Sequence, residues 1–193
     1  MKKIVSSAIL MFVAAAEAFS AGGIVRLEME RLKFVSILAE PVSGRCEIVA
    51  DESGNVRWRV FSPFESLLIV NARGAFRFEK VSGQWRRLES GFAEKTRRIA
   101  AEIASIAKGE VPDSYAVRRS ERTVVLEPKN PAVARFVKSV RIELGERGNI
   151  PQSIEFEEPN GDKTVLKTLS ATENPPNANA AFDESDFMGF EKK

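Results

Sequence analysis

The chain has 193 residues, of which 29 are Lys or Arg, 27 are Asp or Glu, one is Cys and none is His. The absence of histidine excludes a Ser-His-Asp triad, a Cys-His dyad and a histidine-bound zinc ion, and a single cysteine excludes an intramolecular disulfide. A hydrophobic fraction of 44% is typical of a folded domain, and a net charge of +2 is too small to indicate nucleic-acid binding.

The first twenty residues have the pattern of a secretory signal peptide. Lys2 and Lys3 precede an uncharged stretch over residues 4–16, which is shorter than the roughly 20 apolar residues of a membrane-spanning helix. Small residues permit cleavage near Ala18 to Ala21, and no cysteine stands there to carry a lipid anchor. We therefore expect removal of residues 1–20 and a periplasmic product, the alternative being an apolar N-terminal helix.

The next segment, residues 23–38, is ambiguous. Ile24, Leu27 and Arg31 are spaced as on one face of a helix, whereas residues 33–38 could begin a first strand. The pattern alone does not decide between the two.

Cys46 lies in residues 44–49, which have the pattern of a strand. A catalytic thiol needs a base to activate it, and the chain has no histidine for this role. We expect Cys46 to be a small buried hydrophobic residue.

Most of the body alternates between apolar and polar residues, which indicates strands with one buried and one solvated face. The clearest segments are residues 57–60, 75–79, 140–144 and 154–157, and weaker ones are 123–126 and 164–169. Turn-forming residues separate them at 51–55, 81–83, 146–149 and 159–162. We therefore predict an antiparallel meander in which sequential strands are neighbours. Residues 66–70 are continuously apolar, so the pattern does not show which of their side chains face inward.

One segment, residues 92–108, has a helical pattern, with Phe92, Ile99, Ile103 and Ile106 on one stripe. A second, short helix is expected over residues 131–136. The predicted class is α+β, a curved antiparallel sheet with an amphipathic helix long enough to lie across its concave face. The apolar faces of sheet and helix then either pack solid or enclose a cavity.

Several segments resemble motifs of the LolA-like proteins, the periplasmic carriers of outer-membrane lipoproteins. The matches occur in the family's order across roughly residues 29 to 182, nearly the whole mature chain. They are EPVSG at 40–44, VRWRV at 56–60 with SPFESLLIV at 62–70, VLEPK at 125–129, the hairpin at 150–166 that contains NGDKT, and NPPNANAAF at 174–182. Their order and spacing, more than any one motif, carry the resemblance.

The resemblance implies an incomplete, strongly curved antiparallel β-barrel, a half-barrel, with helices covering the concave face. It also implies a monomeric, non-catalytic protein without cofactor or metal, which receives acyl chains from an inner-membrane ABC-type donor and passes them to an outer-membrane acceptor. The apolar residues expected to line its lipid-binding cavity are Trp58, Val60, Leu67, Ile69, Phe76, Phe78, Ile99, Ile103 and Ile106. Each could equally serve in ordinary core packing.

Two departures from the family pattern bear on the cargo. The family's basic residue and proline, which latch the lid, are replaced by Ala50 and Asp51, and its opening F-x-Q-x-K motif is reduced to MERLK at residues 29–33. The alternatives are therefore a carrier of another lipid, such as a glycolipid or a polyene lipid, and a lipid-sensing or protein-interaction domain of the same fold.

An enzyme is the remaining alternative. Two clusters of acidic residues have side chains of the type that forms a catalytic pair or a metal site. They are Glu155, Glu157 and Glu158, and Asp183, Glu184 and Asp186. The first group alternates on the solvated face of a strand and the second lies in a polar tail, so we expect no catalytic residue among them. The expected divisions of the chain are a signal peptide (1–20), a carrier domain (21–182) and a short, loose polar tail (183–193).

Overall fold

The computed structural model describes residues 23–88, 115–146 and 150–188. The expected signal peptide lies outside the described residues. So does the helix expected over residues 92–108, with Ile99, Ile103 and Ile106.

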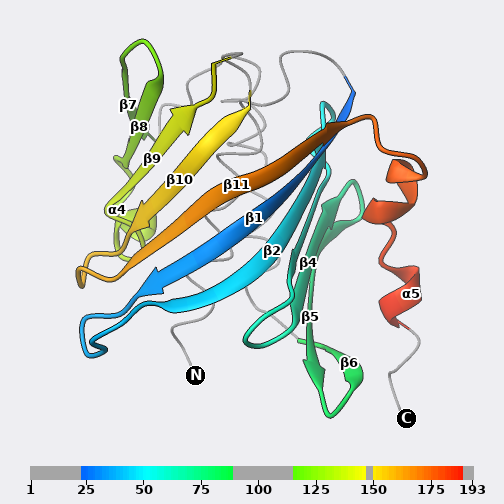
Figure 1. Cartoon of the computed structure of the whole chain (residues 1–193). Helices are drawn as coiled ribbons and strands as arrows, with labels where there is room; N and C mark the ends of the chain where they lie inside the picture. Colours follow the sequence, from blue (N-terminus) through cyan, green and yellow to red (C-terminus); the bar gives the residue numbers. More distant parts are fainter. Residues whose placement is uncertain (1–22, 89–114, 147–149, 189–193) are drawn as a thin grey trace.

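Eleven antiparallel strands form one continuous sheet (Figure 1). Their order is β6-β5-β4-β3-β2-β1-β11-β10-β9-β8-β7. Sequential strands are therefore neighbours except β6 and β7, which lie at opposite edges, and β1 pairs with β11. The predicted meander is thus confirmed. The strands are β1 (Ile24–Phe34), β2 (Val42–Asp51), β3 (Val56–Val60), β4 (Ser66–Asn71), β5 (Gly74–Val81), β6 (Gln84–Arg87), β7 (Tyr115–Arg119), β8 (Thr123–Pro128), β9 (Ser139–Leu144), β10 (Pro151–Glu157) and β11 (Lys163–Glu173).

The ambiguous N-terminal segment is a strand. β1 lies at the centre of the sheet, where it pairs along its length with β2 on one side and β11 on the other. Val25, Leu27 and Met29 alternate to one face and are buried. The helical spacing was equally compatible with the sequence, but the two neighbouring strands can satisfy the backbone of β1 only if it is extended.

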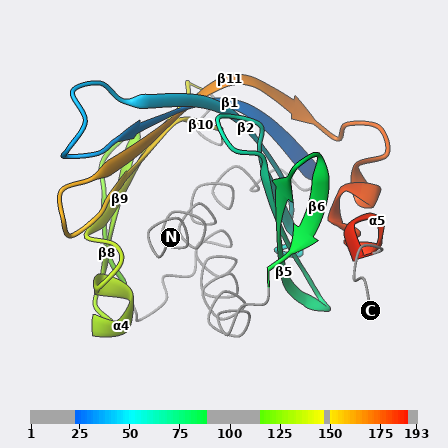
Figure 2. The same ribbon diagram turned by 90° about the horizontal axis from the view of Figure 1, so that it is seen from below.

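The sheet curls strongly and does not close, because β6 and β7 end it on opposite sides (Figure 2). The predicted half-barrel is confirmed to this extent. The helices among the described residues are short: α4 (Pro131–Ala134) lies at the end of β8, and η1 (Ala178–Phe182) and α5 (Ser185–Met188) lie outside the curve (Figure 2). The prediction that helices cover the concave face is therefore not supported by the described part of the chain.

The turns behave as the sequence predicts. Ser82, Gly83 and Gly161 have positive φ angles of 52°, 81° and 84°, which lets the β5–β6 and β10–β11 connections reverse within a few residues. The short helix expected over residues 131–136 is also present, as the single turn α4.

Candidate functional site

The concave face of the sheet is one apolar layer. Cross-strand partners share a face, and Leu27, Ile48, Trp58 and Leu68 form such a row across β1 to β4. A second row crosses the other half of the sheet. It consists of Val124, Ile142, Ile154 and Leu166. All these side chains belong to one buried cluster that extends from β4 to β7. The topology therefore gathers residues from both halves of the chain onto a single hydrophobic surface.

The residues that the sequence predicts as a lipid-binding wall are divided between the two faces. Trp58 and Val60 lie on the concave face within this layer. Four others lie on the outer face, in a separate cluster or packed against it. They are Leu67, Ile69, Phe76 and Phe78. Of the six predicted wall residues that the structure describes, it thus brings two together on the concave face and places four on the outer face.

The strand register decides which face each side chain takes, and the outer face carries apolar side chains because the C-terminal segment covers it. Apolar residues at alternate positions of β5 indicate that one face is buried but do not say by what. The run at residues 66–70 has apolar side chains on both faces, because Leu68 and Val70 belong to the concave cluster and Leu67 and Ile69 to the outer one. β4 is therefore buried on both sides.

The C-terminal segment covers the outer face of β4 to β6. The ring of Phe187 lies 5.5 Å from the ring centroids of both Phe78 and Trp85. Phe182 packs nearby against Val49 of β2. The prediction of a loose tail from residue 183 onward is therefore wrong for residues 183–188, because an aromatic side chain within this polar segment finds an apolar site on the sheet.

We expect replacement of Phe187 by Ala to loosen this contact. In a Trp58→Phe background, where Trp85 is the remaining tryptophan, the emission of Trp85 should shift to longer wavelength as water reaches its ring. The free energy of unfolding should fall by about 1 kcal/mol, the value of one favourable aromatic contact. Phe136→Ala, at an exposed position outside this cluster, is the control. Unchanged emission would show that the C-terminal segment does not protect Trp85.

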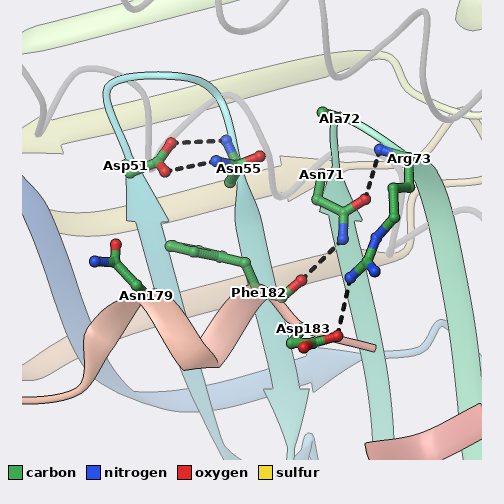
Figure 3. A pocket seen from close by; sticks show the side chains of 8 residues that line it. All are labelled: Asp51, Asn55, Asn71, Ala72, Arg73, Asn179, Phe182 and Asp183. Atoms are coloured by element: carbon green, nitrogen blue, oxygen red, sulfur yellow. Dashed lines mark hydrogen bonds and ion pairs between the residues drawn. The ribbon is translucent and has the colours of Figure 1, made fainter. Parts of the chain in front are cut away.

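A shallow hollow of about 360 Å³ marks the point where the C-terminal segment meets the turns of the sheet (Figure 3). Asn71 donates its side-chain amide to the carbonyl of Phe182 and to the carboxylate of Glu184, at 2.9 and 2.7 Å. Arg73 pairs with Asp183 and Glu184 at 2.9 and 2.7 Å. Asn71 and Arg73 therefore bind the protein's own C-terminal segment, while Asn55 and Asp51 of the same hollow bond to each other.

A network of charges on the outer face joins β3, the β3–β4 loop and β5. Glu65 accepts hydrogen bonds from Arg59 and, at 2.8 Å, from Lys80. Both cations also lie over the ring of Trp85, at 5.7 Å from its centroid. Burial by itself raises the pKa of Glu65, but the hydrogen bonds from Lys80 and Arg59 outweigh it and hold the pKa below its usual value of 4.5.

The depressed pKa of Glu65 gives a prediction for stability against pH. Because the folded state favours the charged carboxylate, its stabilising effect is complete above the unfolded-state pKa and is lost as the pH falls through the folded-state pKa. Glu65→Gln should lower the free energy of unfolding by up to about 1 kcal/mol at pH 7. The difference from the wild type should shrink as the pH falls below about 4.5 and vanish once the pH lies below the folded-state pKa of Glu65. Urea titrations at several pH values measure this, and a pH-independent difference would contradict it.

The concave layer contains a charged residue, Arg31, that the sequence places on a possible helix face but does not predict as a binding residue. Arg31 follows Leu27 and Met29 at alternate positions of β1, so its side chain shares their face, and burial lowers its pKa. The sequence does contain a signal for this role, because Arg31 is a basic residue at a position that the alternation of β1 assigns to the buried face. It was missed because this segment had not been resolved as a strand.

The remaining sequence candidates have structural partners. Glu155, Glu157 and Glu158 pair with Lys163, Lys138 and Lys33, at 3.1, 2.9 and 3.4 Å. Within the described ranges no group of acidic or cysteine side chains is arranged to hold a metal ion. These carboxylates stabilise the sheet through ion pairs.

Cys46 is buried as predicted. Its side chain is 1% exposed, and burial raises the pKa of its thiol to about 11. The thiol is therefore neutral at physiological pH and unreactive as a nucleophile.

No protein-family model matches this chain, and no curated protein matches it in sequence. Among solved structures, a DUF1329 family protein from Desulfovibrio piger is similar over 94% of this chain and 98% of its own, with 6% identity and a TM-score of 0.50. A LolA superfamily protein from Nitrosomonas europaea is similar over 93% and 98%, with 11% identity and a TM-score of 0.42. A domain named for outer membrane lipoprotein sorting, from Vibrio parahaemolyticus, is similar over 92% and 100%, with 11% identity and a TM-score of 0.42.

These likenesses concern the fold. The identities lie far below the level at which a residue's role carries over, so the site rests on the geometry described above. The likeness to the DUF1329 family protein, at 6% identity and a TM-score of 0.50, concerns the fold alone, and the resemblance to LolA-like proteins rests on the sequence motifs.

Proposed function

We propose that this protein is a periplasmic carrier that shelters the acyl chains of lipoproteins on the apolar concave face and moves them from the inner to the outer membrane. The observation that supports this most is the continuous apolar layer from β4 to β7. Each CH₂ group of a bound chain removed from water would gain about 0.8 kcal/mol. A LolA-like fold, which is a carrier-type fold, supports the same assignment.

Non-catalytic binding fits the chemistry of this surface. Its cysteine is neutral and deeply buried, and the carboxylate candidates are engaged in ion pairs on other parts of the sheet. A carrier needs a surface that binds and releases an unreactive chain, for which apolar side chains suffice.

The remaining parts of the proposal rest on the sequence and on the resemblance. Residues 1–20 would direct export, and the helix expected over residues 92–108 would cover the concave face with Ile99, Ile103 and Ile106. The protein would act as a monomer between an ABC-type donor and an outer-membrane acceptor. In the described part of the chain, no helix has the length and hydrophobicity that crossing a membrane requires.

A carrier of another lipid is the second candidate. It is favoured by Ala50 and Asp51, which replace the family's basic residue and proline, and by a half-buried arginine, Arg31, elsewhere on the concave face. Extraction of the protein from its native compartment without detergent, followed by mass spectrometry, distinguishes the two. Triacylated lipopeptides or intact lipoproteins support the first candidate, and a different lipid supports the second.

The two tryptophans allow a direct test of where an acyl chain binds, because Trp58 lies on the concave face and Trp85 on the outer face. Bromine atoms on an acyl chain quench a tryptophan only at close range. We expect 9,10-dibromostearate to quench the Trp85→Phe variant, which retains Trp58, and to leave the Trp58→Phe variant nearly unquenched. Unbrominated stearate is the control. Quenching confined to Trp85, or absent from both variants, would refute binding on the concave face.

A further inference from the structure

The row of apolar residues across β8 to β11 ends at a charged side chain. Leu166 of β11 stands opposite Arg31 of β1, and on its other side Arg31 stands opposite Gly44 of β2. Arg31 therefore lies on the concave face, at the place where the two halves of the sheet join. Gly44 has no side chain, and the carbonyl oxygen of Ser62 occupies the place that a side chain would take, so no charged group of β2 stands opposite the guanidinium.

Arg31 has no partner of opposite charge in the described ranges. Its Nε atom is buried and forms no hydrogen bond. The neighbouring ionisable group is the thiol of Cys46, which is neutral because burial raises its pKa to about 11. Arg57, a half-buried arginine on the outer face, also has a buried Nε without a hydrogen bond, but its guanidinium pairs with Glu47 at 3.4 Å.

A second cation and a hydroxyl group lie beside Arg31 on the same face. Lys33 is two residues further along β1 and stands opposite Thr164 of β11. Thr164 is 1% exposed, and its Oγ1 also has no hydrogen-bond partner in the part of the chain described. Lys33 pairs with Glu158 at 3.4 Å. Two strands thus bring together two cations and a buried hydroxyl. Two carboxylates lie at their edge, Glu158, which pairs with Lys33, and the buried Asp162, which accepts a hydrogen bond from the Ser36 amide.

The arrangement of Arg31, Lys33 and Thr164 is energetically unfavourable without an anion. A guanidinium remains protonated at any physiological pH, and burying it without an anion is costly. An arriving phosphate or carboxylate would compensate the charge and accept charge-assisted hydrogen bonds, and the planar guanidinium can hold either through two bonds at once. Apolar side chains surround the group on the concave face, which suits a ligand with a charged head and a hydrocarbon tail.

We propose that Arg31, Lys33 and Thr164 form a subsite for the anionic head group, a phosphate or a carboxylate, of an amphiphile whose chain lies along the concave apolar layer. This inference rests on the proposed carrier function and adds a preference for charge to it. The subsite lies on β1 and β11, so it is distinct from the family's latch at the position of Ala50 and Asp51.

Calorimetric titration of the full protein tests this with four probes below their micelle-forming concentrations: dodecyl phosphate, dodecanoate, the neutral dodecyl maltoside, and inorganic phosphate. We expect at least one of the two anionic amphiphiles to bind tenfold or more tightly than the maltoside. Arg31→Met should remove about tenfold of that affinity and leave the maltoside unchanged. Arg57→Met, which deletes a comparable arginine on the outer face, should change neither.

Each result separates the subsite from the carrier function. Equal affinity for charged and neutral amphiphiles, or an Arg31→Met variant that retains the preference for charge, would overturn the subsite and leave the carrier standing. Failure of every amphiphile to bind would overturn the carrier. Inorganic phosphate bound as tightly as dodecyl phosphate would assign the site to a free anion and overturn the head-group assignment.

The stability of the unliganded variant provides an independent readout. If Arg31 served the fold, Arg31→Met would lower the melting temperature. We expect a melting temperature equal to or above that of the wild type, because the variant removes a half-buried charge that has no partner of opposite sign among the described residues. A marked decrease would show that Arg31 stabilises the sheet and would overturn its role in binding.

Discussion

Phe78→Ala is expected to lower the free energy of unfolding by about 3–5 kcal/mol, the range for deleting a buried phenylalanine. The side chain of Phe78 is 0% exposed. It packs beside its cross-strand partner Leu67 and under the ring of Phe187, whose centroid is 5.5 Å away. Because folded domains have about 5–15 kcal/mol of stability, the variant should remain folded at 25 °C, and chemical denaturation can measure the loss.

The same variant distinguishes packing from ligand binding. Phe78 lies on the outer face, so its loss should leave the affinity for dibromostearate unchanged, as reported by quenching of Trp58. Phe64→Ala is the matched control, since Phe64 is 80% exposed and should cost less than about 0.5 kcal/mol. A small loss of stability together with weakened binding would return Phe78 to the lipid-binding wall.

Gly44→Ala is expected to cost about 3 kcal/mol, although it adds a single methyl group. A Cβ atom at position 44 would overlap the carbonyl oxygen of Ser62 and lie 3.0 Å from its carbonyl carbon. Backbone atoms cannot rotate away as the end of a side chain can. Two hydrogen bonds also hold the strands together at this point, from the Arg45 amide to Ser62 Oγ at 3.1 Å and from the Phe61 amide to the Arg45 carbonyl at 2.8 Å.

Gly83→Ala serves as the comparison for this prediction. Gly83 has a φ of 81°, and no atom lies within 4 Å of the position that a Cβ atom would take. The variant should therefore cost about 1–2 kcal/mol from backbone strain alone. Denaturant titrations of both variants give the two values. If Gly44→Ala were the milder change, the β3–β4 loop would have to shift easily away from β2.

The alternation of residues determined the strands. Segments such as residues 57–60 and 154–157 placed a hydrophobic side chain at every second position, and a half-buried strand accounts for that period. Gly83 and Gly161 stood where the chain had to reverse, and both take up positive φ angles. These features are local, so they can be read without knowing what packs against them.

The place of each strand within the sheet could be determined only from the tertiary structure. β1 was ambiguous because its hydrophobic residues fit two periods, and pairing with both β2 and β11 made it a strand. The same pairing placed Arg31 on the concave face. No local pattern could show this, since β11 lies more than a hundred residues further along the chain.

The sequence by itself determined the antiparallel meander, its turns, the burial of Cys46 and the resemblance to LolA-like proteins, because these depend on local periodicity, turn chemistry and motif order. The tertiary structure decided which apolar residues share a face. It separated Trp58 and Val60 from Leu67, Ile69, Phe76 and Phe78, because the C-terminal segment covers the outer side of β4 to β6. A period of two shows that a strand has a buried face, but only the neighbouring elements determine what that face is buried against.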